Sequence, residues 1–386
     1  MTFDFDAPID RSGTWASRWD RYAGRDVIPL WVADTDFRAP PAVLEAFSAR
    51  IAHGVFGYSV PPDALRAAIV ERMQQLYGWA IEPSWIVFLP GVVPGLHLAA
   101  RHLCDADQHV LLPTPIYQHF KRAVQLAPRE HDDIPLILDG GRWVLDEAFL
   151  ERALRPNSRL LFLCNPQNPG GTIFTRAELE RLAALAERHD LVICSDEIHA
   201  DLLMDEGKPH VPIASLAPEI SRRSVTLMSP NKTFNFPAAG VAYAIIEDAR
   251  LRAAFSRDHH ATLHDASVFG YIGALAAYRD GQGWLDAQLA YLRGNRDLVE
   301  AMVAETPGLD MAHTEATYLA WIDASGLGVE DPFAHFLAAG VALSPGAQFG
   351  SPSFVRLNFG TQRARLVEAL ARMKQASRGQ TPVDKS

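Results

Sequence analysis

The sequence predicts an α/β fold, in which a mostly parallel central sheet is covered by helices and a smaller α+β domain lies beside it. From about residue 84 to 246, short apolar runs alternate with helical patterns. Runs that are apolar without alternation are typical of strands buried on both faces, and strand–helix repetition is typical of parallel sheets. The last third of the chain has a different hydrophobic pattern, with one long helical segment and separate short strands. This change of pattern indicates the smaller domain.

The central sheet is predicted from six apolar runs, at residues 86–89, 110–112, 160–163, 191–194, 225–228 and 241–246. Between two of these runs, residues 176–189 carry Leu179, Leu182 and Leu185 on one helical stripe, with charged residues elsewhere. An apolar stripe of this width predicts a helix that packs on the sheet.

The smaller domain is predicted from a helix over 284–305 and from strands over 318–322 and 355–359, which flank a helix over 332–339. We expect the N-terminal segment to pack beside these elements. The large domain is therefore predicted to span residues 46–280. The small domain is predicted to combine residues 1–45 and 281–386, with a polar tail that is disordered after about residue 376.

The composition of the 386-residue chain restricts its function class. Hydrophobic residues make up 48% and charged residues 21%, as in soluble globular proteins. The formal charge is −10, from 36 basic and 46 acidic side chains, which argues against a nucleic-acid partner. No apolar run approaches the ~20 residues that a membrane span needs, and the acidic N-terminus lacks the order of a signal peptide.

The three cysteines, Cys104, Cys164 and Cys194, form no CxxC pair. An odd number of widely spaced cysteines suits a reducing cytosol, so we expect a cytoplasmic protein. Cys164 and Cys194 each end an apolar run, which indicates buried strand cysteines. Cys104 is interpreted as a core thiol on a helix over 94–104.

Polar side chains follow three successive runs of the predicted sheet, at the points where the strands end. They supply an amide, a carboxylate with an imidazole, and an amine with a hydroxyl: Asn168, Asp196, His199, Ser229 and Lys232. Because ligands of parallel α/β sheets bind beyond the carboxyl ends of the strands, we expect these side chains to form one site.

These groups match the requirements of pyridoxal 5'-phosphate (PLP). Lys232 can form the Schiff base, and Asp196 can face the pyridine nitrogen, so that the ring stays protonated and withdraws electrons. Asn168 and His199 can face the phenolate oxygen. Tyr117 follows a strand and opens a helix, so it can stack on the ring.

A phosphate cradle is predicted at Gly91, Val92 and Val93. These residues lie between the strand that ends at Leu89 and the helix that begins at Pro94. Backbone N–H groups at the start of a helix are well placed to bind a phosphate.

Longer motifs give the chain a resemblance to a known family. The motifs are Trp31-Val32-Ala33-Asp34 and residues 53–58, 195–199, 229–235, 346–350 and 354–359. In them the chain resembles the fold-type I PLP enzymes of the class I/II aminotransferase family. Within that family it is most similar to the cystathionine β-lyase-like C–S lyase branch. The resemblance runs from about Arg11 to Met373 and implies the type I PLP-dependent transferase fold.

The resemblance implies a role for each matching position. It places the Schiff base on Lys232, the pyridine partner at Asp196 and the phenolate partner at Asn168. His199 stands where many relatives carry a tyrosine. The resemblance also implies that Tyr117 stacks on the ring as a catalytic residue beside Lys232 and Asp196. Ser229 would hold the phosphate.

Substrate and partner residues are implied in the same way. Arg356 is expected to grip the substrate α-carboxylate in a bidentate pair, and Ala33 is expected to line the substrate site. Tyr58 would reach the phosphate of the neighbouring subunit, which implies a homodimer with shared active sites. Two departures bear on substrate preference: Gln167 stands where the branch often has histidine, and Gly170 where many relatives have threonine.

Other interpretations of the same residues fit less well. Ser229 and Lys232 match the Ser-x-x-Lys spacing of penicillin-binding hydrolases, but the companion motifs of those enzymes are missing. His259, His260 and His264 lack supporting Cys or Asp residues at ligand spacing. We therefore interpret them as helix-surface histidines and expect no metal.

Two reactions fit the predicted chemistry. In a C–S β-lyase, free Lys232 removes the Cα proton of cystathionine or another cysteine S-conjugate, and the β-thiolate leaves, with pyruvate and ammonia as the other products. An aminotransferase shares the first steps. The branch resemblance favours the lyase. A PLP-binding regulatory protein is a third interpretation, but the chain has neither a spare domain nor a basic patch.

Overall fold

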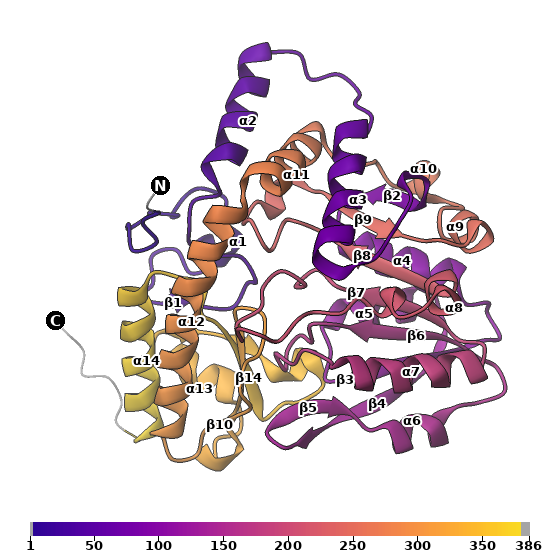
Figure 1. Cartoon of the computed structure of the whole chain (residues 1–386). Helices are drawn as coiled ribbons and strands as arrows, with labels where there is room; N and C mark the ends of the chain where they lie inside the picture. Colours follow the sequence, from indigo (N-terminus) through magenta and orange to yellow (C-terminus); the bar gives the residue numbers. More distant parts are fainter. Residues whose placement is uncertain (1–2, 380–386) are drawn as a thin grey trace.

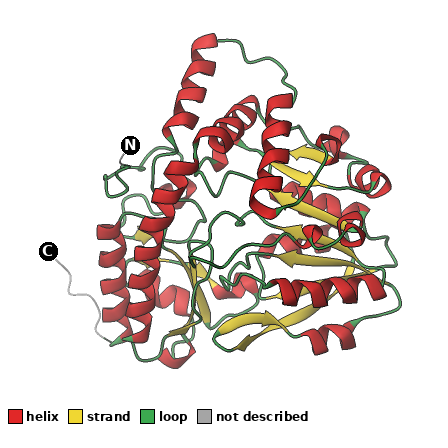
Figure 2. Cartoon of the chain, in the orientation of Figure 1, coloured by secondary structure: helices red, strands yellow, loops and turns green. Residues whose placement is uncertain are grey.

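The computed structural model describes residues 3–379, without the side chains of His260 and Thr262. Within this range the largest feature is an eight-stranded sheet (Figures 1 and 2). In sheet order its strands are β2 (Ile86–Leu89), β9 (Ala242–Ile245), β8 (Ser224–Met228), β7 (Val192–Asp196), β6 (Ser158–Cys164), β3 (His109–Thr114), β4 (Glu130–Asp139) and β5 (Arg142–Leu145).

The sheet is mostly parallel, as the sequence predicts. Neighbouring strands are parallel from β8 through β7, β6 and β3 to β4. Only the margins are antiparallel, where β9 pairs with β8 and β2, and β5 pairs with β4. All six apolar runs form strands of this sheet.

The hairpin of β4 and β5 was not predicted. It lies at the edge of the sheet, and along β4 only Ile134 and Leu136 are buried. An edge strand of this kind needs no continuous apolar run, so its sequence is largely polar.

Helices cover both faces of the sheet because alternate residues of a strand point to opposite sides. On one face, Val110, Leu112 and Phe162 pack against α4 (Val92–His102), α5 (Gln118–Leu126) and α9 (Ala249–Phe255). On the other face, Leu111, Leu161 and Ile193 pack against α6 (Glu147–Ala153) and α7 (Arg176–Arg188). The predicted stripe of Leu179, Leu182 and Leu185 is buried on α7.

The remaining helices of this part lie around the sheet. They are α2 (Pro41–His53), α3 (Asp63–Tyr77), α8 (Pro218–Arg222), α10 (His259–Thr262) and α11 (Val268–Asp280). In Figure 1, α2, α3 and α11 stand together at the upper end of the molecule.

The C-terminal third forms a smaller sheet with its own helices. The sheet order is β10 (Asp310–Met311), β11 (Leu319–Asp323), β14 (Phe354–Asn358) and β13 (Ser344–Pro345). The helices are α12 (Gln282–Ala304), α13 (Pro332–Ala338) and α14 (Arg363–Ser377), and α12 lies beside α14 (Figure 1). These elements match the predicted helices and strands of the last third.

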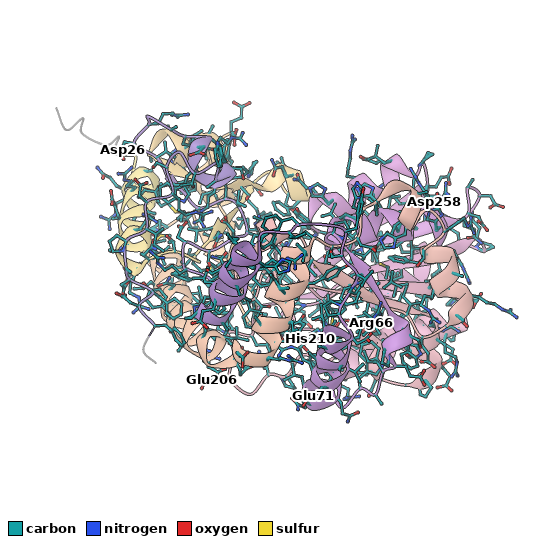
Figure 3. The ribbon with its side chains drawn as sticks, turned by 90° about the horizontal axis from the view of Figure 1, so that it is seen from above. Asp26, Arg66, Glu71, Glu206, His210 and Asp258 are labelled. Carbon is teal, nitrogen blue, oxygen red and sulfur yellow. The ribbon has the colours of Figure 1, made fainter. Side chains whose placement is uncertain are left out.

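The N-terminal segment packs beside the C-terminal third, as expected. Its strand β1 (Ile28–Pro29) pairs in parallel with β12 (Val341–Ala342). Figure 3 shows Asp26 of this segment and Asp258, just before α10, at opposite ends of the molecule. The domain boundaries at residues 46 and 281 stay a prediction. Most of the predicted disordered tail, residues 380–386, lies outside the described residues.

Three cysteine predictions can be compared with the fold. Cys164 and Cys194 are buried in β6 and β7, as predicted. Cys104 is also buried, but α4 ends at His102, so this thiol lies in the turn after the helix. Among the described helices, none combines the length and apolar character needed to span a bilayer.

The interpretation of the histidines after α9 is wrong in part. His259 is only 1% exposed, since the loop folds back and its ring lies 3.5 Å from the Asp265 carboxylate. His264 is exposed, but it lies in a loop after α10. The His260 side chain is outside the described residues. The described part of the chain contains no group of His, Cys, Asp and Glu suited to a metal ion.

Candidate active site

The predicted site residues converge at the carboxyl ends of β6, β7 and β8. Asp196 is the last residue of β7, Asn168 lies in the turn after β6, and Lys232 follows β8. Arg356 reaches the same place from β14 of the smaller sheet, where its Nη1 donates to Asn168 Oδ1 at 2.8 Å. The site therefore lies where the two sheets meet.

Lys232 is a partly buried amine. Its Nζ donates a hydrogen bond to the Ala33 carbonyl of the N-terminal segment. Burial lowers the pKa of Lys232 to about 8, with a further decrease from Arg356, while Asp34 and Asp196 act in the opposite direction. Near neutral pH, Lys232 is therefore neutral more often than a lysine in water and can act as nucleophile or base.

Asp196 is a buried carboxyl group that is 4% exposed. Burial raises its pKa to about 7, and the neighbouring Glu197 raises it further. Two groups lower the pKa in opposition: the backbone N–H of Ile198, which donates to Oδ1 at 3.1 Å, and Lys232. A cation placed against such a carboxyl would restore its charge. A protonated pyridine nitrogen is a cation of the right size, so Asp196 fits the predicted role.

Arg356 is buried and has no carboxylate partner among the described residues. Besides Asn168, its guanidinium contacts the Trp31 carbonyl at 3.2 Å and Ser344 Oγ at 3.3 Å, and it lies 4.7 Å from the centre of the Phe349 ring. Its Nε has no hydrogen-bond partner in the described structure. Burial lowers the pKa of Arg356 to about 10. A buried guanidinium of this kind gains from a bound carboxylate.

Two rings complete the centre of the site. Burial lowers the pKa of His199 to about 3, and Lys232 and Arg356 lower it further, so its ring is neutral. His199 Nδ1 is buried without a hydrogen-bond partner in the described residues, so it can serve a ligand. Tyr117 precedes the first residue of α5. Burial raises its pKa, Arg356 lowers it and Asp196 raises it.

The predicted phosphate cradle falls at the start of α4. Gly91 caps α4, so the N–H groups of Val92 and Val93 belong to the first turn, where helix N–H groups lack intrahelical partners. Ser229 Oγ donates to the Val241 carbonyl at 2.6 Å, and the adjacent Gly240 lies against the Pro90 carbonyl. The cradle and Ser229 are thus neighbours. A phosphate bound at Ser229 would accept the hydrogen bond that Ser229 Oγ now donates to the Val241 carbonyl.

Tyr58 is not part of this cluster within one chain. Its side chain is fully exposed, in a segment whose other apolar residues are also exposed, namely Val55, Phe56 and Val60. The other predicted residues, including Ala33, lie in the site.

Local sequence patterns give no role to three further residues of the site. Tyr318 Oη donates to the Ala33 carbonyl at 3.1 Å, Asp34 raises the pKa of Lys232 against the effect of burial, and Phe349 lies under Arg356. Each belongs to a strand pattern or motif that was recognised. Their roles depend on contacts across long sequence separations, which no local pattern reports.

Gln167 and Gly170, the two departures from the family pattern, fit each other. Gln167 is 2% exposed, its Oε1 accepts a hydrogen bond from the Gly170 N–H, and its Nε2 donates to the Pro115 carbonyl at 2.7 Å. A Cβ at Gly170 would lie 2.7 Å from Gln167 Oε1 and 2.9 Å from the Trp143 ring. The long amide at position 167 therefore requires a residue without a side chain at position 170.

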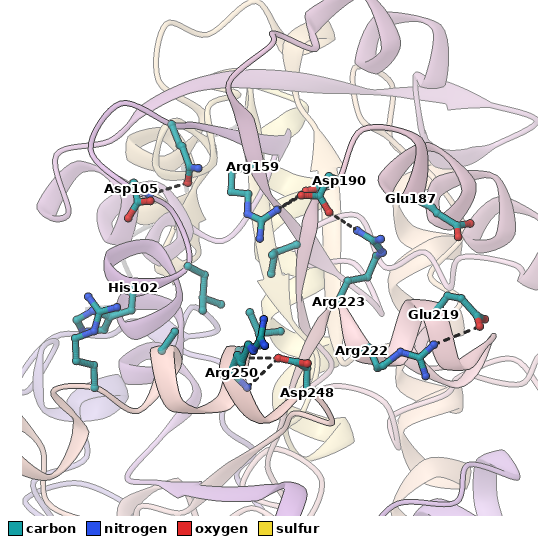
Figure 4. A pocket seen from close by; sticks show the side chains of 16 residues that line it. His102, Asp105, Arg159, Glu187, Asp190, Glu219, Arg222, Arg223, Asp248 and Arg250 are labelled. Carbon is teal, nitrogen blue, oxygen red and sulfur yellow. Dashed lines mark hydrogen bonds and ion pairs between the residues drawn. The ribbon is translucent and has the colours of Figure 1, made fainter.

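A separate cavity of about 810 Å³ lies at the amino ends of β6, β7 and β8 (Figure 4). It is lined mainly by charged residues that pair with one another, for example Arg159 and Arg223 with Asp190. None of the candidate site residues lines it. The ligand site of a parallel α/β sheet lies at the opposite end of the strands, so this cavity is not the candidate active site.

Comparisons with known proteins agree with the geometry. The family profile described as "Aminotransferase class I and II" matches residues 25–373. "Cystathionine beta-lyase PatB" of Bacillus subtilis (strain 168) is 36% identical, over 97% of this chain and 99% of that protein. A solved structure described as "Crystal Structure of OvoB" is 49% identical with a TM-score of 0.95, over 97% and 99% of the two chains. Cystalysin of Treponema denticola, whose structure contains pyridoxal 5'-phosphate, is 28% identical with a TM-score of 0.93, over 98% and 100%.

Proposed function

Because the chain belongs to the class I and II aminotransferase family, we propose that it is a PLP-dependent carbon–sulfur β-lyase. It would cleave cystathionine or another S-substituted cysteine to a thiol, pyruvate and ammonia. The observation that supports this most is the convergence of Lys232, Asp196 and the carboxylate-free Arg356 at one edge of the sheet. Its similarity to a relative named cystathionine β-lyase favours elimination over amino transfer.

The described residues can hold PLP at both of its ends. Asp196 would hold the proton of the pyridine nitrogen, and Asn168 and His199 would face the phenolate oxygen. The first turn of α4 and Ser229 would bind the phosphate. Bound PLP would supply an electron sink for the negative charge that develops at the substrate Cα.

Side chains and backbone groups of the protein would bind the substrate and transfer its proton. Arg356 would bind the substrate α-carboxylate through its planar fork, in place of its present neutral partners. Lys232 Nζ would take the Cα proton, and the Ala33 carbonyl would hold the resulting ammonium group. Tyr117 keeps its phenolic proton at neutral pH, because burial raises its pKa.

We also propose a homodimer in which Tyr58 reaches the phosphate site of the partner. The support is an exposed apolar segment, in which Ile51 is 61%, Val55 62%, Phe56 55% and Val60 81% exposed. A cavity of about 530 Å³ lies between residues 56–59 and 263–268 and could receive side chains of a second copy. A contiguous run of exposed apolar residues of this kind is typical of an interaction surface. Mixing inactive Tyr58→Ala and Lys232→Ala subunits should restore activity if the sites are shared.

A cytoplasmic location is proposed from the cysteines. All three are free and buried, as in proteins of reducing compartments.

The decisive experiment compares two reactions of the purified holoenzyme. Pyruvate and thiol release from L-cystathionine is measured without an oxo-acid acceptor, and amino transfer from aspartate or glutamate is measured with one. The lyase proposal expects release to exceed transfer by a wide margin. Lys232→Ala should abolish release, whereas the matched variant Lys121→Ala, at an exposed surface pair with Asp133, should not. Fast transfer without thiol release from any cysteine conjugate would show that the enzyme is an aminotransferase.

A further inference from the structure

Residues 29–35 of the N-terminal segment, here called the strap, run along the candidate active site. The Ala33 carbonyl of the strap accepts hydrogen bonds from Lys232 Nζ and from Tyr318 Oη. Its Trp31 carbonyl accepts one from Arg356 Nη2 at 3.2 Å. Two backbone carbonyls of the strap therefore contact the amine and the guanidinium on which the proposed reaction depends.

Arg18, on the short helix α1 (Ser17–Asp20), binds the strap at both of its ends. Its Nε donates to the Pro29 carbonyl at 2.7 Å, and its Nη1 donates to the Asp34 carbonyl at 3.0 Å. The same guanidinium lies 3.3 Å from Asp34 Oδ1 and 3.4 Å from Asp36 Oδ2. One planar group thus sets the distance between the two ends of the strap.

The Arg18 side chain is 0% exposed. Burial of a guanidinium is costly unless its charge is balanced. Nε and Nη1 of Arg18 make hydrogen bonds, whereas Nη2 makes only the 3.4 Å ion pair with Asp36. Asp34 and Asp36 provide that balance, and Arg11 binds both carboxylates from the other side, at 2.7 and 2.8 Å. The position of Arg18 is therefore fixed by its partners, and it can fix the strap in turn.

The strap is also attached by contacts that do not involve Arg18. Asn358 Nδ2 donates to the carbonyls of Val32 and Asp34, and Asn235 exchanges two hydrogen bonds of 3.0 Å with the backbone of Thr35. Loss of Arg18 would therefore leave the strap in place, but with a less defined spacing between its ends. The Ala33 and Trp31 carbonyls lie between those ends.

We infer that Arg18 is a positioning residue of the active site, which holds the Ala33 and Trp31 carbonyls in register with Lys232 and Arg356. This inference rests on the proposed function. Arg18 does not touch the substrate in this arrangement and acts only through the strap. A misplacement of about 1 Å in a positioning element can lower a rate by about 100-fold, so the effect should be large.

The test uses three variants of the holoenzyme. Arg18→Met removes the fork, and Arg18→Lys keeps a positive charge but replaces the planar fork by a single ammonium group. Arg365→Met is the matched control, since Arg365 pairs with Asp36 of the same network at 3.3 Å but makes no hydrogen bond or ion pair with the strap. The melting temperature reports the structural cost of each change.

Two functional quantities are then compared. One is kcat/KM for an S-substituted cysteine. The other is the Kd of 3-(methylthio)propionate, a carboxylate that lacks the amine and cannot react. We expect both Arg18 variants to lose about 100-fold in kcat/KM, and the analogue to bind about 10-fold more weakly. Arg365→Met should stay within about 3-fold of wild type in both quantities.

The inference is overturned if the Arg18 variants match Arg365→Met in kcat/KM and in analogue binding at a comparable loss of melting temperature. Arg18→Lys decides the question if Arg18→Met does not fold. Failure of the proposed function has a different signature, because the wild-type enzyme would then release no thiol from any substrate. The analogue would still report on Arg356 in that case.

Discussion

Substitution of Gly170 by alanine tests how the turn after β6 is built. A Cβ added at this position would lie 2.7 Å from Gln167 Oε1, well inside the contact distance of the two atoms. Gly170 does not have a left-handed φ angle, so the backbone itself accepts alanine. The expected loss of stability comes mainly from the displaced Gln167 amide, with a smaller part from the close contact to Trp143.

The magnitude follows from the hydrogen bonds of Gln167. Displacement breaks its bonds to the Gly170 N–H and the Pro115 carbonyl, each worth about 1 kcal/mol, and leaves a buried polar group unsatisfied at about 1 kcal/mol more. The total is about 3 kcal/mol. For 386 residues the unfolding entropy is about 0.8 kcal/mol/K, so the melting temperature should fall by about 4 °C.

The double variant supplies the control. Gln167→Ala alone loses the same two hydrogen bonds, so it should also cost about 3 kcal/mol. Gly170→Ala added to Gln167→Ala should then cost only what the remaining close contact with the Trp143 ring costs, about 1 kcal/mol, because the clashing oxygen is gone. The coupling energy should therefore be about 2 kcal/mol. Thermal unfolding of the four holoenzymes, followed by circular dichroism, measures this coupling. A Gly170→Ala protein that melts within about 1 °C of wild type, or strictly additive losses, would refute the reasoning.

Three further predictions concern charge. Asp196→Ala should still fold, but it should release thiol at least about 1,000-fold more slowly in steady-state assays. A folded variant that binds PLP and keeps near-normal turnover would exclude Asp196 as the pyridine partner. Arg356→Lys should raise KM for the amino acid by at least about 10-fold, since an ammonium group lacks the planar fork. The absorbance band of the bound cofactor should stay unchanged, and an unchanged KM would contradict the role of Arg356. Burial lowers the pKa of His313, but hydrogen bonds and charges of Asp205 and Glu300 outweigh this and raise it above 6.5. The contribution of His313 to stability is therefore full below pH 6.5 and disappears as pH rises through the raised pKa. Because the ring is half-exposed, the contribution is about 0.5 kcal/mol or less. Urea unfolding of wild type and His313→Gln at several pH values should show the difference in stability shrinking as pH rises above the raised pKa.

Much of the site was predictable from sequence because its residues follow strands that have a clear local signal. The runs before Asn168, Asp196 and Lys232 are buried on both faces, so they consist almost entirely of apolar residues. Parallel pairing then brings the ends of the three strands to one edge. The helix after the first strand was predictable for a similar reason, since a helical pattern follows a strand after a short turn, although α4 begins at Val92, two residues before the predicted start at Pro94.

Only the tertiary structure decided which distant groups face those strand ends. The strap lies about 200 residues from Lys232 in sequence, and nothing in its local pattern shows that the Ala33 carbonyl would meet Nζ. The same holds for Arg18, a charged residue that a local pattern would leave on the surface, but which pairing with Asp34 and Asp36 allows to be fully buried. Local sequence determines which segments form strands and helices, because the apolar periodicity that favours each depends on neighbours within a few residues. The partners of a buried charge depend on long-range packing, which becomes defined only when the two sheets and the N-terminal segment come together.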